Sequence, residues 1–120
     1  MSDLLELREK LRVFAHERDW EQFHSPKNLS MAIACEAGEL LELFQWLSET
    51  ESKAIMENEK KADSVRHELA DVLLYIVRLA DVLGINLKEA ATAKIALNAA
   101  RYPVVASHGS AQKHTELGNI

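Results

Sequence analysis

Four acidic residues arranged in two pairs are the strongest chemical signal in the sequence. Glu36 and Glu39 lie in CEAGELLELFQW, and Glu68 and Asp71 lie in RHELADVLLY. Because each pair has i, i+3 spacing within an apolar stretch, we expect its carboxylates to lie one turn apart on a helix. Such carboxylates repel each other, and no Lys or Arg stands three or four residues away from any of them.

Glu36 falls within the apolar face of its predicted helix. At about 100° per residue, the same face holds Leu29, Ile33, Leu40, Leu43, Phe44 and Leu47. An isolated ionised carboxylate at such a position would lose its hydration at a cost of several kcal/mol. The paired acids therefore indicate a hard divalent cation held by oxygen ligands, and Mg²⁺ is the natural candidate.

Composition narrows the possible classes of protein. A chain of 120 residues with 48% hydrophobic residues, four Gly and two Pro predicts one compact helical domain. The net charge of −5 and the lack of a basic run argue against nucleic-acid binding. The single cysteine, Cys35, cannot form an internal disulfide and is expected to be a small core residue. We find neither a signal peptide nor a membrane span, and expect a cytoplasmic protein.

Apolar periodicity and capping residues predict an all-α, four-helix bundle. We expect helices over about 3–20, 28–47, 62–83 and 87–101. Pro26 should lie in a loop that ends the first helix, Gly84 should cap the end of the third, and Asn86 with Glu89 resembles a capping box at the start of the fourth. A charged connector over 48–64 allows one short helix at its centre. Residues 1–103 would form the domain, and residues 104–120 a flexible tail. The third helix is apolar over more than half of its circumference, so we expect part of it to contact another subunit.

The order and spacing of the motifs resemble a known family. ExxE, a 28-residue spacer and ExxD are similar to the signature of the MazG-like all-α nucleoside triphosphate pyrophosphohydrolases. RDWEQFHSPKNL, FQW and KIALNAARYP resemble the dCTP pyrophosphatase branch of that family. The resemblance implies hydrolysis of a nucleoside triphosphate, with dCTP or a related dNTP as the expected substrate, to a monophosphate and pyrophosphate. It also implies a homodimer or a homotetramer built as a dimer of dimers.

The resemblance also implies roles for individual residues. The metal ligands and catalytic carboxylates would be Glu36, Glu39, Glu68 and Asp71, with Mg²⁺ as the cofactor. Base and sugar contacts would come from Trp20, His24, Trp46 and Tyr75, while Lys94 and Asn98 would reach the sugar or phosphates. Arg101 is a further cation of the kind that phosphates require. The number of magnesium ions and the identity of the general base stay open.

Two other interpretations are compatible with the acidic pairs. A di-iron carboxylate bundle also uses glutamates from facing helices, but it requires ExxH on two helices, and only Glu21 with His24 has that spacing. A non-enzymatic helical oligomerisation module could line a partner groove with acids, but it leaves Glu36 in an apolar face without a basic partner. The sequence does not decide between nucleotides, deoxy or ribo, undamaged or damaged.

Overall fold

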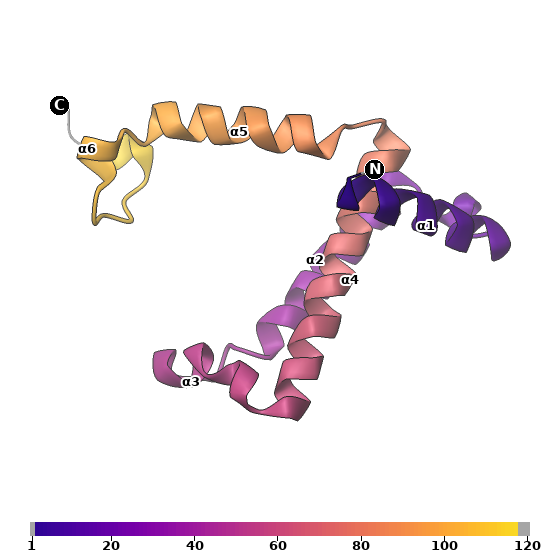
Figure 1. Ribbon diagram of the computed structural model, residues 1–120, viewed down its shortest axis with the longest axis horizontal. Helices are drawn as coiled ribbons and strands as arrows, with labels where there is room; N and C mark the ends of the chain where they lie inside the picture. The colour runs from indigo at the N-terminus through magenta and orange to yellow at the C-terminus, as the bar shows by residue number, and fades with distance from the viewer. Residues whose placement is uncertain (1, 118–120) are drawn as a thin grey trace. The chain divides into compact units, whose positions relative to one another are not determined.

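The computed structural model describes residues 2–117, and all regular structure among these residues is helical, with no β-strand. The elements are α1 (Asp3–Glu17), η1 (Glu21–Phe23), α2 (Pro26–Glu42), α3 (Glu49–Lys53), η2 (Ile55–Glu57), α4 (Glu59–Leu83), α5 (Leu87–Arg101), α6 (Val104–Ser107) and η3 (His114–Glu116). The all-α prediction is confirmed. The chain divides into two compact units, one ending at Ile85 and one beginning at Asn86 (Figure 1).

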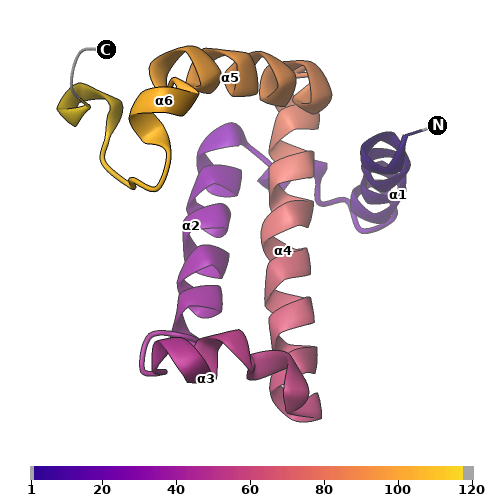
Figure 2. The ribbon, with the colours of Figure 1, turned by 60° about the vertical axis from the view of Figure 1, so that its left-hand side comes forward.

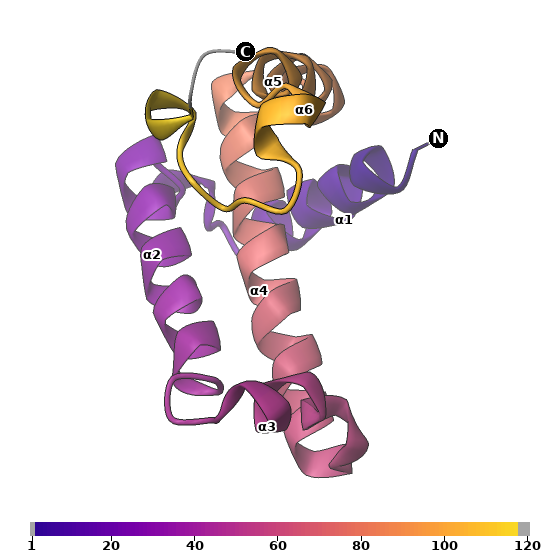
Figure 3. The same cartoon turned by 90° about the vertical axis from the view of Figure 1, so that its left-hand side faces the viewer.

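The first unit is built on two long helices, α2 and α4, which lie side by side and run in opposite directions (Figures 2 and 3). The short helices α3 and η2 join them, and α1 packs against α4. Leu29 of α2, Val77 of α4 and Ala15 of α1 are among the buried apolar residues. The packing of α2 against α4 brings the two acidic motifs to the same interface.

The start of α2 differs from the prediction. Pro26 does not lie in a loop before the helix but occupies its first turn, with Ser25 as the N-cap whose Oγ accepts a hydrogen bond from the Asn28 amide. Proline is well suited to this position, because its missing N–H would have no partner within the helix and its φ is already helical. The preceding helix, α1, ends at Glu17 rather than near Trp20, and Asp19 has a left-handed φ of 53°.

The end of α2 also differs from the prediction, since the helix stops at Glu42 and not at Leu47. The amides of Leu43, Phe44 and Leu47 bond to carbonyls three residues earlier, so the chain tightens into turns. Trp46 therefore lies in a turn and not within the helix predicted over residues 28–47.

The predicted third helix corresponds to α4, which begins three residues earlier than expected because Asn58 caps it and accepts from the Lys61 amide. At its other end Gly84 adopts a φ of 70°, which confirms the predicted glycine cap. The connector contains a short helix, α3, but at its start and not at its centre, and η2 follows it. No helix of the described residues is both long enough and apolar enough to cross a membrane.

The second unit contains α5, α6 and η3. Asn86 caps α5 by accepting from the Glu89 amide, as predicted, and the helix ends at Arg101 before Pro103. The Tyr102 ring meets the His114 ring edge-on, with centroids 5.7 Å apart. The tail that the sequence predicted to be flexible therefore includes α6 and η3. Its flexibility stays a prediction. Residues 118–120 lie outside the described residues.

Candidate metal centre

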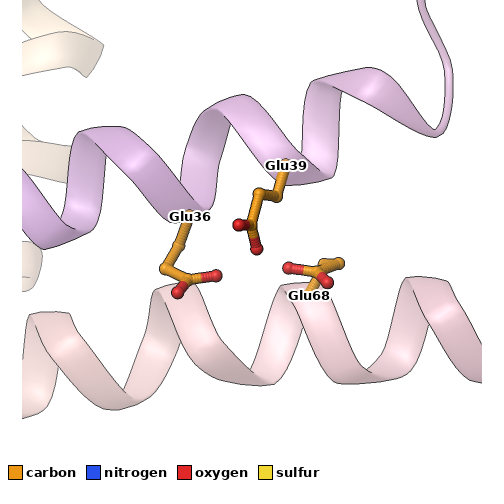
Figure 4. A group of neighbouring side chains, drawn as sticks. All are labelled: Glu36, Glu39 and Glu68. Atoms are coloured by element: carbon orange, nitrogen blue, oxygen red, sulfur yellow. The ribbon is translucent and has the colours of Figure 1, made fainter.

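The antiparallel pairing of α2 and α4 brings three of the four predicted carboxylates together. Glu36 and Glu39 project from successive turns of α2 toward Glu68 of α4 (Figure 4). Each of these three residues offers one oxygen, and the three oxygens lie within 4.8 Å of one another. The i, i+3 spacing therefore places both acids of α2 at one interface, and the facing helix supplies the third.

Burial makes this group unusual for a cluster of acids. Glu36 and Glu68 are partly buried, and the Oε2 atom of each is inaccessible to solvent and has no hydrogen-bond partner among the described residues. Burial, then interaction with Glu39 and the charges of Asp71 and Glu68, raises the pKa of Glu36 to about 7. Burial and the neighbouring Glu39 also raise the pKa of Glu68. Without a cation, the cluster can lower its repulsion only by holding protons.

Asp71, the fourth predicted ligand, lies on α4 three residues after Glu68. Its negative charge contributes to the raised pKa values of both Glu36 and Glu68, so it is part of the same acidic environment. Its carboxylate does not belong to the three whose oxygens lie within 4.8 Å of one another. Ligation by Asp71 stays a prediction, whereas the other three carboxylates already converge.

The donor set fits a hard cation. All three converging groups are carboxylates, which are the ligands that Mg²⁺ and Ca²⁺ prefer in proteins. The two buried oxygens without partners are the atoms that a cation would satisfy, since an unpaired buried acceptor is costly.

The residues that a di-iron site would need are engaged elsewhere. Glu21 pairs with Nδ1 of His16 at 2.9 Å, and Nδ1 of His24 accepts a hydrogen bond from Nε of Arg78 at 3.0 Å. The one ExxH motif therefore contributes no ligand to the carboxylate group, and the geometry disfavours the di-iron interpretation.

Four residues of the first unit were predicted to contact the nucleotide, and the structure places them at different locations. The Trp20 ring meets His24 edge-on, with centroids 6.4 Å apart, and lies 5.6 Å from the Phe14 ring. Tyr75 lies on α4, four residues after Asp71, and is partly buried. Trp46, by contrast, is 87% exposed in the turn after α2. Substrate contact by these residues stays a prediction.

The remaining predicted contacts are Lys94, Asn98 and Arg101. All three are exposed residues of α5, at i, i+4 and i+7 positions, so they share one side of that helix. They belong to the second unit, and their contact with a nucleotide stays a prediction.

Sequence reasoning missed a charged network in the first unit. Asp81 of α4 accepts two hydrogen bonds from Arg12 of α1, at 2.7 Å and 2.6 Å, and lies 3.4 Å from Nη1 of Arg78. These residues, with Val13, His16 and Glu21, line an open cavity of about 450 Å³. The available signal was Arg78, which continues the line of polar residues formed by Glu68, Asp71 and Tyr75 along α4.

Comparison with known proteins shows the family and the fold. The model of the MazG-like family matches residues 31–117, which includes both acidic motifs. A crystal structure of a pyrophosphatase from Archaeoglobus fulgidus is similar with a TM-score of 0.79 and 40% identity, and the match covers 86% of this chain and 94% of that one.

Two mammalian proteins are also similar over 104 residues. The chain is 49% identical to dCTP pyrophosphatase 1 of Mus musculus and 43% identical to dCTP pyrophosphatase 1 of Homo sapiens. Each match covers 87% of this chain but only 61% of the relative, so the chain spans about three fifths of the length of these relatives.

Proposed function

The chain belongs to the MazG-like family, and from this premise we propose that it is a Mg²⁺-dependent nucleoside triphosphate pyrophosphohydrolase. Its products would be a nucleoside monophosphate and pyrophosphate. Since the similar mammalian proteins are dCTP pyrophosphatases, the proposed substrate is a deoxynucleoside triphosphate such as dCTP. The observation that carries the proposal is the convergence of Glu36, Glu39 and Glu68 at the α2–α4 interface, with two buried oxygens left without partners.

The charge of the site explains why a cation is needed. A nucleoside triphosphate carries about four negative charges and cannot approach a group of carboxylates without positive charge between them. Mg²⁺, when bound, would supply that charge and neutralise the developing negative charge of the leaving pyrophosphate. Glu36, Glu39 and Glu68 would hold it, with Asp71 as the proposed fourth ligand.

The protein groups have their own part in the reaction. The water that attacks the α-phosphate must lose a proton, and a carboxylate at the rim of the cluster is a suitable acceptor. Glu39 is exposed, whereas Glu36 and Glu68 are partly buried, so Glu39 is the carboxylate that water reaches most easily. A cytoplasmic location is part of the proposal. Cys35 is exposed and not the core residue that the sequence predicted, and its free thiol fits a reducing compartment.

The direct test is product analysis with dCTP and Mg²⁺. We expect monophosphate and pyrophosphate, and formation of diphosphate with orthophosphate would contradict attack at the α-phosphate.

Glu39→Gln and Asp71→Asn should each lower kcat at least a hundredfold, because each removes a carboxylate charge while keeping the side-chain shape. Glu17→Gln is the matched control, since Glu17 is an exposed acid at the end of α1. Wild-type rates in a site variant would exclude that residue from the site, and inactivity of the wild type on a panel of triphosphates would favour the non-enzymatic module.

We further propose that the protein is a homodimer or a homotetramer. Leu69 and Leu73 of α4 are 56% and 41% exposed in the described chain, and they extend the apolar surface that the sequence predicted. A second copy of the chain is the proposed cover for this face. Light scattering at micromolar concentration should give a multiple of 13.5 kDa, and Leu69→Asp should shift the mass toward the monomer. A monomeric wild type would exclude the proposal.

A further inference from the structure

Arg78 is buried, with a relative exposure of 9%, and its Nε lies 3.0 Å from Nδ1 of His24. A guanidinium group has only donors and stays protonated in proteins. Nδ1 of His24 must therefore accept the hydrogen bond, which excludes a proton on that nitrogen. The remaining nitrogen, Nε2, then carries the ring proton of a neutral imidazole.

The surrounding charges favour the same state. The Asp81 carboxylate faces two guanidinium groups, those of Arg12 and Arg78, so one negative charge is shared between two positive ones. Burial and the nearby Arg78 lower the pKa of His24, and Glu21, on the η1 side, opposes them more weakly. The net effect keeps His24 neutral near pH 7.

Position along α4 relates this pair to the proposed metal centre. Arg78 follows Asp71 by seven residues, or two helical turns, which is about 10 Å along the helix axis. Tyr75 lies between them on the same polar strip of α4. A neutral donor at this distance from the carboxylates suits the uncharged part of a nucleotide better than its phosphates. The Trp20 ring, edge-on to His24 at 6.4 Å between centroids, adds an aromatic neighbour suited to a planar base.

We propose that Arg78 is a positioning residue that holds His24 as a neutral Nε2–H donor. Contact between this donor and an acceptor atom of the nucleobase follows from the family resemblance and rests on the proposed function. The donor state of His24 concerns only the protein and can be tested without turnover.

The tautomer is tested by NMR of the histidine nitrogens. The sequence contains five histidines, and the spectrum of His24→Gln assigns the resonances of His24. In the wild type we expect Nε2 to be protonated and Nδ1 unprotonated between pH 7 and 8. In Arg78→Met the two tautomers should mix, and the ring should titrate close to its ordinary pKa of about 6.5. A protonated Nδ1 in the wild type, or an unchanged spectrum in Arg78→Met, would overturn the assignment.

Arg12→Met is the control for indirect effects. Arg12 bonds to Asp81, but the hydrogen bond to His24 comes from Arg78, so this variant should keep the wild-type tautomer. An equal change in both variants would show that the tautomer follows the packing of α1 and not Arg78. Should Arg78→Met fail to fold, Arg78→Lys keeps a cationic donor with different geometry, and the wild-type spectrum alone still decides the tautomer.

Contact with the base is tested by binding and kinetics. Deoxycytidine monophosphate with Mg²⁺ should shift the His24 Nε2 resonance, whereas inorganic triphosphate and deoxyribose 5-phosphate with Mg²⁺ should not. A shift with inorganic triphosphate or with deoxyribose 5-phosphate would place a phosphate or a sugar at His24 and would contradict contact between His24 and the base. With a hydrolysed substrate, Arg78→Met should raise KM roughly threefold to tenfold and change kcat less than twofold. An inactive wild type would refute the proposed function but leave the tautomer measurement valid.

Discussion

At the scale of single residues, Glu36 determines the pH dependence expected of the metal-free protein. Burial, then interaction with Glu39 and the charges of Asp71 and Glu68, raises its pKa from 4.5 to about 7. A carboxyl group with a higher pKa in the folded state binds more protons when folded, so the free energy of unfolding falls as pH rises. In chelator, we therefore expect the melting temperature of the wild type to fall between pH 4.5 and about 7.

Glu36→Gln should flatten this dependence, because the amide cannot ionise. The measurement is a series of thermal melts in chelator across that pH range, with Glu17→Gln as the control acid on the exposed surface of α1. Identical slopes in the wild type and in Glu36→Gln would mean that Glu36 is not the group responsible.

The sequence predicted the carboxylates of the site but not the charged network next to it. Glu36, Glu39 and Glu68 could be found because i, i+3 spacing is a local pattern and their apolar surroundings are visible in the sequence. Asp81 and Arg12 are separated by 69 residues, and nothing in their local sequence reveals that α1 crosses α4 at this point. The partner of His24 depends on the same tertiary contact, since Arg78 is 54 residues away from it.

At the scale of helices, the existence of the long elements was predictable, whereas their ends were not. Periodicity identified all four long helices, and Asn86 and Gly84 were correctly recognised as caps. Pro26 is ambiguous in a sequence, because proline both ends a preceding helix and favours the first turn of a following one. The structure selects the second role, with Ser25 as the cap.

The Arg12–Asp81 pair should stabilise the packing of α1 on α4. Arg12 donates two hydrogen bonds to a carboxylate whose side chain is 9% exposed, so Arg12→Met leaves a buried charge with only the longer contact to Arg78. Because hydrogen bonds to charged groups are stabilising, we expect Arg12→Met to have a lower free energy of unfolding than the wild type in urea at pH 7.

Acid should reduce the difference between these two proteins. The hydrogen bond from Arg12 lowers the pKa of Asp81 below its usual 3.8, so the stabilisation is present above about pH 4 and is lost as pH falls through the lowered value. The difference in stability between wild type and Arg12→Met should therefore shrink as the pH falls below about 4. A constant difference from pH 7 to pH 2 would show that Arg12 acts through packing and not through its charge.

At the scale of the whole molecule, repulsion among the clustered carboxylates should make the stability of the folded chain depend on bound metal. The folded chain brings acids of α2 and α4 together, while the unfolded chain keeps them apart. A cation that binds only the folded state at about 100 times its dissociation constant stabilises that state by about 2.7 kcal/mol. For a domain of this size, we expect Mg²⁺ to raise the melting temperature of the wild type by roughly 10 °C.

Glu36→Gln separates metal binding from an ordinary acidic surface, because it removes a repulsive charge and a proposed ligand at once. The variant should melt no lower than the wild type in chelator near pH 7.5, since the ionised form of Glu36 is unfavourable in its partly buried position. In millimolar Mg²⁺ it should gain much less than the wild type, while Glu17→Gln should gain the full amount. Melts of the three proteins in chelator and in Mg²⁺ provide the measurement, and equal Mg²⁺ shifts in all three would exclude Glu36 as a ligand.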